Sequence, residues 1–136
     1  VDQHGKDLEQ AQFDLANYRL PTRNKNGVKI KNPTAAIIVS NPCIEVWFIL
    51  HFELLQRTFE KNKNSKSQNC KQYLRDKHIN DYEESIQNLY RRIRDKEETA
   101  HTNVTKLKAN NKSLNMSELD TDIHLLCRYL QSMEIK

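Results

Sequence analysis

The chain has 136 residues, of which 37% are hydrophobic and 29% are charged, and its formal net charge is +4. This length suits one domain, and the composition excludes a collagen, a long disordered chain and a disulfide scaffold. The longest apolar run, Val46 to Leu50, is far shorter than the roughly 20 residues that cross a bilayer, so we expect no contact with a membrane.

The N-terminal third is predicted to contain a helix, a turn and a strand. Apolar residues recur at spacings of three and four over residues 7–19, which predicts an amphipathic helix. The pair Asn26-Gly27 predicts a tight turn. Residues 34–40 are apolar and rich in β-branched side chains, a pattern typical of a strand buried on both faces of a parallel sheet. An open α/β sheet is therefore expected at this end of the chain.

The remainder is predicted to be helical. An apolar helix is expected from Cys43 to about Leu55, since Pro42 suits its first turn. A short helix is predicted over residues 68–77, and a helical period continues over residues 82–107. Asp120 or Thr121 is predicted to cap a last helix that ends near Met133.

Two further features concern the whole chain. The three cysteines are odd in number and too widely spaced for a zinc site, which favours free thiols in a reducing compartment. We therefore expect a cytoplasmic protein. Because the sequence begins Val1-Asp2 without a Met, we also expect it to be part of a longer chain.

Positive charge is concentrated in two segments. Residues 19–31 hold five basic residues and no acid, and residues 57–77 hold seven basic residues and two acids. Lysine and arginine displace counterions from phosphates, so both segments are candidates for binding nucleic acid, although simple solvated loops have the same composition. The candidate residues are Arg23, Lys25, Lys29, Lys31, Lys61, Lys63 and Lys66.

Two acids are candidates for a metal site. Asp2 and Glu45 each follow a predicted strand, and the carboxyl ends of parallel strands are where open α/β sheets bind ligands. Carboxylates suit Mg²⁺. The alternatives are that Asp2 caps a helix and that Glu45 interacts with the helix dipole or with a buried partner. His4 and His51 are minor candidates, because imidazole is a poor ligand for Mg²⁺.

Residues 40–53, Ser-Asn-Pro-Cys-Ile-Glu-Val-Trp-Phe-Ile-Leu-His-Phe-Glu, resemble the hallmark segment of the RloB family of bacterial proteins. Residues 1–4 resemble the end of that family's acidic strand, and residues 120–130 are similar to its closing helix. The Asn-Pro pair that usually precedes this helix is replaced here. The resemblance extends over most of the chain.

The resemblance implies a Toprim-like (Rossmann-like) α/β fold with a parallel sheet and a helical C-terminal half, mostly α-helical in this chain. Residues 1–56 would be the C-terminal part of the α/β domain. Residues 57–80 would be a basic loop with a short helix, and residues 81–136 the helical end of the same domain.

The resemblance also implies a Mg²⁺- or Mn²⁺-dependent nuclease, or a nuclease-like subunit, which acts in phage defence beside an AAA-type ATPase. Asp2 would match the second acid of the Toprim Asp-x-Asp pair, and Glu45 the family's signature acid, while Ser40, Asn41 and Pro42 would shape the turn before Glu45. The other Toprim acids would lie upstream. The alternatives are a sensor that binds nucleic acid without cutting it and a module that binds the ATPase.

Overall fold

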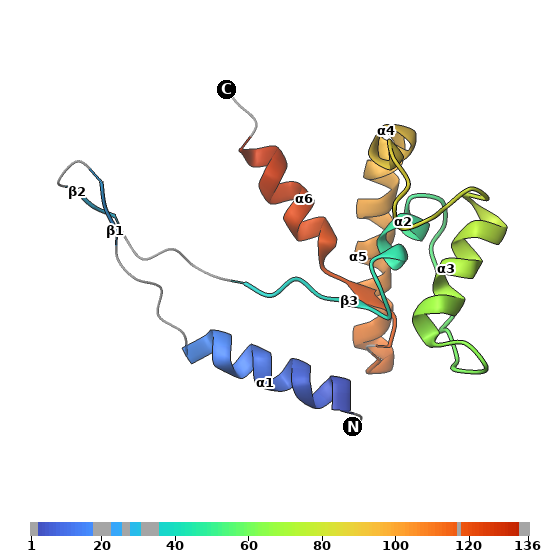
Figure 1. Ribbon diagram of the computed structural model, residues 1–136, viewed down its shortest axis with the longest axis horizontal. Helices are drawn as coiled ribbons and strands as arrows, with labels where there is room; N and C mark the ends of the chain where they lie inside the picture. The colour runs from blue at the N-terminus through green and yellow to red at the C-terminus, as the bar shows by residue number, and fades with distance from the viewer. Residues whose placement is uncertain (1–2, 18–22, 26–27, 31–35, 117, 134–136) are drawn as a thin grey trace. The chain divides into compact units, whose positions relative to one another are not determined.

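The computed structural model describes residues 3–17, 23–25, 28–30, 36–116 and 118–133, and these are mostly helical (Figure 1). The predominantly helical character expected from the sequence is therefore confirmed. The contacts divide the chain into two compact units, residues 1–37 and residues 38–136. None of the helices in the described part of the chain is both long and apolar enough to span a membrane.

The first unit contains a helix and a small hairpin. Helix α1 covers Gln3–Asn17, close to the predicted range 7–19. Strands β1 (Arg23–Lys25) and β2 (Val28–Ile30) pair antiparallel, with Lys25 opposite Val28. The predicted Asn26-Gly27 turn lies between these strands but outside the described residues.

The predicted parallel strand over residues 34–40 is wrong where the structure describes it. Residues 36–39 form no regular element and none of them is buried, while residues 34 and 35 lie outside the described residues. Strand β3 is only Ser40–Asn41, and it pairs antiparallel with β4 (Asp120–Thr121). An apolar β-branched run does not specify its partner, and the pairing here joins segments about 80 positions apart. The described residues contain no parallel pair of strands.

The helices of the second unit depart from the predicted ranges. In place of the predicted helix 43–55 there is one short helix, α2. The predicted helix 82–107 is broken, because residues 82–88 form turns. Tyr82 and Ile86 in these turns still pack against the core. The helices are α2 (Glu45–Leu50), α3 (Lys66–Lys77), α4 (Leu89–Ile93), the 3₁₀ helix η1 (Arg94–Lys96), α5 (Glu97–Leu114) and α6 (Ile123–Ser132).

Local signals fix several helix ends. Ser65 begins α3 with a capping box, in which its hydroxyl accepts from the Gln68 amide and the Gln68 side chain accepts from the Ser65 amide. Helix α5 ends at Asn115, whose positive φ of 52° is one that Asn adopts more readily than most residues. The predicted caps of α6 are partly right: Asp122 is the capping residue without a side-chain bond, and the Thr121 hydroxyl accepts from the Ile123 amide at 3.3 Å.

Helix α2 lies at the centre of the second unit. It packs against both α3 and α5, and Val46, Ile49 and Leu50 are fully buried. The Asn103 side chain of α5 donates to the Leu50 carbonyl at 2.8 Å, which satisfies an otherwise free acceptor at the end of α2. Each Å² of apolar surface that this helix buries contributes about 25 cal/mol to the stability of the unit that carries the candidate site.

Candidate nucleic-acid interface

The segment that follows α2 carries four exposed cations. Arg57, Lys61, Lys63 and Lys66 lie within ten positions of one another, and all four are exposed. None of them makes an ion pair with any residue that the structure describes. Glu60 is the one acid between them. The segment therefore presents a net charge of +3 to solvent.

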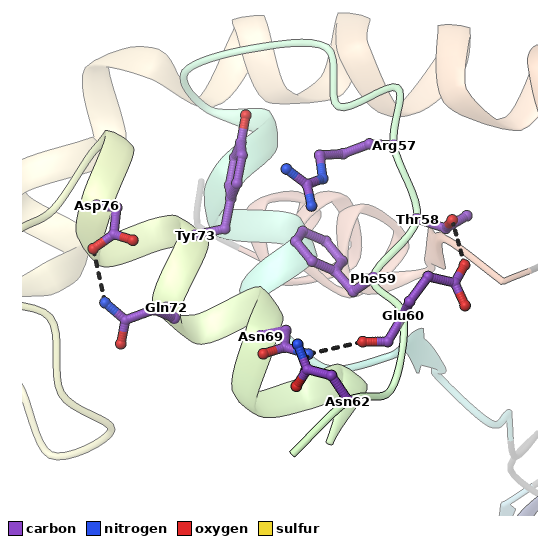
Figure 2. A pocket seen from close by; sticks show the side chains of 9 residues that line it. All are labelled: Arg57, Thr58, Phe59, Glu60, Asn62, Asn69, Gln72, Tyr73 and Asp76. Atoms are coloured by element: carbon purple, nitrogen blue, oxygen red, sulfur yellow. Dashed lines mark hydrogen bonds between the residues drawn. The ribbon is translucent and has the colours of Figure 1, made fainter. Parts of the chain in front are cut away.

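Residues 61–66, here called the lysine loop, are held by hydrogen bonds. The Asn62 side-chain oxygen accepts from the Asn64 amide at 2.8 Å. The Asn69 side chain of α3 donates to the Glu60 carbonyl at 2.8 Å and to the Asn62 side chain at 3.3 Å (Figure 2). With Ser65 capping α3, both ends of the loop are fixed. The three lysines therefore extend from a defined backbone.

Arg57 is positioned by two aromatic rings. Its guanidinium lies 5.3 Å from the centre of the Phe59 ring and 5.2 Å from that of Tyr73. Phe59 is buried, and the Tyr73 hydroxyl donates to the Glu53 carboxylate at 2.8 Å, so both rings are fixed. No hydrogen bond from the guanidinium to another described residue is present. Because no described residue accepts from its N–H groups, they can donate to an incoming acceptor.

A cavity of about 320 Å³ opens beside Arg57, between the segment 57–62 and helix α3 (Figure 2). We call it the Arg57 cavity. Its lining residues include Arg57, Phe59 and Tyr73, together with Glu60, Asn69 and Asp76. The Glu60 carboxylate points away from α3 toward Thr58, whereas its carbonyl faces Asn69 (Figure 2). Charged, aromatic and amide groups thus converge on one depression next to the lysine loop.

The candidates in the first unit are only partly described. Asp2 and Lys31 lie outside the described residues. His4 lies in α1, Arg23 and Lys25 in β1, and Lys29 in β2. Their backbones are described and their side chains are not, so the first basic segment stays a prediction.

Glu45 begins α2 and is buried, with 2% of its surface exposed. The Tyr82 hydroxyl donates to Glu45 Oε1 at 2.7 Å, and Oε2 has no hydrogen-bond partner among the described residues. Burial, together with this hydrogen bond, raises the pKa of Tyr82. The neighbouring Cys70 and Glu45 side chains, together with burial, raise the pKa of the Cys43 thiol, which therefore stays protonated at neutral pH. Glu45 thus has a buried hydrogen-bond partner, Tyr82, as one of the alternatives from the sequence expected.

The turn before Glu45 is defined by residues from two elements. The Asn41–Pro42 peptide bond is cis. The Ser40 hydroxyl and the Thr121 hydroxyl are 2.7 Å apart, and the Pro42 carbonyl accepts from the Ser67 hydroxyl at 3.0 Å. Pro42 precedes α2 by three positions and does not form its first turn. Ser40 and Pro42 hold the turn to β4 and to α3.

His51 is part of a cluster around Trp47 and does not contact the Arg57 cavity. Its Nδ1 lies 2.9 Å from the Trp47 carbonyl, and the imidazoles of His51, His101 and His124 surround the Trp47 ring. Burial lowers the pKa of His51 and of His124. The cluster joins α2, α5 and α6.

Within the described ranges, no three His, Cys, Asp or Glu side chains are arranged to hold a metal ion. The unpartnered Glu45 Oε2 could supply one bond to a cation. Mg²⁺ takes six oxygen ligands, so the described residues alone do not form its site.

The residues that position Arg57 were not predicted from the sequence. Arg57 itself lies in the recognised basic segment, but Phe59 and Tyr73 are 14 positions apart and meet only because the chain folds back onto α3. The alternation Arg57-Thr58-Phe59 was an available signal, since an aromatic residue two positions from an arginine favours a stacked pair in extended chain. Nothing local indicated Asp76.

Comparisons with known proteins give the following. The family model described as RloB-like protein matches residues 1–130 of the chain. No curated protein matches it, and no solved structure does.

Proposed function

Since the chain belongs to the RloB-like family, we propose that it binds a single strand of nucleic acid along residues 57–76. The observation that carries this proposal is a set of four cations that pair with no described acid: Arg57 on its two rings and the three lysines of the lysine loop. Phosphates pair with the lysines, and the aromatic and guanidinium groups offer faces on which unpaired bases stack.

The experiment measures binding of fluorescent 12-nucleotide RNA and DNA over a series of salt concentrations. In the triple variant Lys61→Gln, Lys63→Gln, Lys66→Gln, binding weakens and the slope of log K against log salt falls by about 2, since each lost phosphate contact removes about 0.7 for single strands. Equal slopes in the parent and the variant would contradict the proposal.

A matched control removes the same charge elsewhere. Arg91, Lys106 and Lys112 are exposed, lie on α4 and α5, and make no ion pair with any described residue. Replacing all three by Gln changes the net charge by the same amount. We expect this variant to keep the larger part of the parent affinity and its salt slope, which separates a local interface from a general charge effect.

The resemblance supports a second, larger proposal, in which the protein is a cytoplasmic, metal-dependent nuclease subunit with a Toprim-like domain that acts beside an AAA-type ATPase in phage defence. Asp2, Glu45 and acids outside the described residues would hold Mg²⁺ or Mn²⁺. When bound, such an ion lowers the pKa of a water and polarises a phosphoryl oxygen. The residues at 57–76 would hold the strand. A sensor that binds nucleic acid without cutting, or a module that binds the ATPase, is the alternative.

Cleavage assays distinguish these functions. Labelled RNA and DNA are incubated with Mg²⁺ or Mn²⁺, with and without the ATPase, for the parent, Asp2→Ala and Glu45→Gln. Cleavage that both substitutions abolish while the proteins stay folded supports the nuclease. Binding without cleavage under every condition supports the sensor.

A further inference from the structure

Two lining residues of the Arg57 cavity carry complementary groups, the Arg57 guanidinium as a donor and the Asp76 carboxylate as an acceptor. The Arg57 guanidinium donates to no described residue. Glu60 accepts from Thr58 through Oε1, and Asp76 accepts from Gln72 through Oδ1. The second oxygen of each carboxylate takes no hydrogen bond within the described part of the chain. In the view of Figure 2 the Tyr73 ring lies between Asp76 and Arg57.

This combination matches one of the four bases best. Guanine has two adjacent acceptors, O6 and N7, which a guanidinium recognises, and two adjacent donors, N1–H and the 2-amino group, which a carboxylate recognises. Adenine, cytosine and uracil lack one or the other of these pairs. The cavity, at about 320 Å³, is large enough for one such base.

We propose that the Arg57 cavity binds one unstacked guanine, with Arg57 donating to O6 or N7 and Asp76 accepting from N1–H or the 2-amino group. The inference rests on the proposed binding of single strands and adds a base preference to it. The lysine loop then holds the flanking phosphates without regard to sequence.

The proposed site recognises the guanine base, which occurs both in a strand and in a free nucleotide. One arm of the experiment therefore uses oligouridines that differ at a central position, which is guanine, adenine or hypoxanthine. The other arm titrates GMP alone, followed by the chemical shifts of the amides of residues 57–76. The same titrations are made with Asp76→Asn and with the control Asp95→Asn, because Asp95 is exposed, lies in η1 and makes no ion pair with a described residue.

The guanine oligonucleotide is expected to bind about tenfold more tightly than the adenine one, with hypoxanthine between them because it lacks the 2-amino group. Asp76→Asn removes this preference and keeps the affinity for the adenine oligonucleotide, whereas Asp95→Asn keeps the preference. Both aspartates are exposed, so neither substitution removes a buried group. GMP binding as tight as that of the guanine oligonucleotide identifies the free nucleotide as the ligand, and weaker GMP binding identifies the strand.

Failure of this inference and failure of the proposed function give different results. If all three oligonucleotides bind equally with a steep salt dependence, the guanine site is refuted and strand binding stands. If no oligonucleotide binds but GMP shifts the amides of the cavity, strand binding is refuted and the guanine site stands. If GMP also produces no shifts, both are refuted.

Discussion

Removing the Tyr82 hydroxyl tests whether Glu45 is held as a buried structural group. The hydroxyl donates to Glu45 Oε1 at 2.7 Å, Tyr82 is 3% exposed and Glu45 is 2% exposed. Oε2 has no hydrogen-bond partner among the described residues, and Tyr82→Phe removes the hydrogen bond that Oε1 accepts. A buried polar group deprived of its partner costs about 1–3 kcal/mol, and we expect the free energy of unfolding to fall by about 2 kcal/mol.

The assay is urea unfolding followed by the fluorescence of Trp47, the single tryptophan of the chain, which is buried. In thermal unfolding of the same variant, a loss of about 2 kcal/mol lowers Tm by roughly 6–10 °C for a chain of this size. Tyr90→Phe is the matched control, because Tyr90 is 65% exposed and its hydroxyl makes no hydrogen bond with a described residue. A loss below about 0.5 kcal/mol for Tyr82→Phe, equal to that of the control, would refute the reasoning.

Three further predictions concern stability. Burial lowers the pKa of His51 and of His124. Near and below the ordinary histidine pKa of 6.5, the folded chain therefore binds fewer protons than the unfolded chain. The free energy of unfolding is thus expected to fall as the pH drops from about 7.5 to 5.5. Urea unfolding at those two pH values checks this, and a His124→Gln variant whose pH dependence equals that of the parent would contradict the role of His124. Ser65→Ala removes the cap of α3 and is expected to cost about 1 kcal/mol, measured by the same unfolding, while Ser85→Ala, on an exposed residue outside any helix, serves as control. Asn103→Ala leaves the Leu50 carbonyl without its donor and is expected to cost about 1–3 kcal/mol; an unchanged urea midpoint would show that this hydrogen bond contributes nothing.

Local signals predicted the presence of the helices better than their ends, and they predicted the sheet poorly. Helix α3 was placed within two residues because the inward Cys70, Tyr73 and Leu74 recur at helical spacing. The Ser65 cap, which sets the observed start of this helix, was not predicted. The strand prediction failed because residues 36–39 have the composition of a strand but pair with no parallel strand among the described residues; the Val39 carbonyl instead accepts from the Asp122 amide beside β4. Five helices separate Ser40 from Thr121 in the chain, so their pairing depends on how these helices pack and is not predicted by any local pattern.

The candidate site was predicted in its charge and missed in its geometry. The lysines at positions 61, 63 and 66 are exposed, as a basic segment poor in apolar residues indicates. The position of Arg57 is set by Phe59 and by Tyr73, a residue on α3, so it follows from tertiary packing. The partner of Glu45 was equally hidden, since Tyr82 is 37 positions away.

The most direct test of the central claim is to map where a single strand binds. A uniformly ¹⁵N-labelled chain is titrated with an unlabelled 12-nucleotide strand, and the amide chemical shifts are followed. The largest shifts are expected within residues 57–76, at Arg57, the lysine loop and the face of α3 that lines the cavity. Shifts confined to other residues, with residues 57–76 unchanged, would contradict the claim.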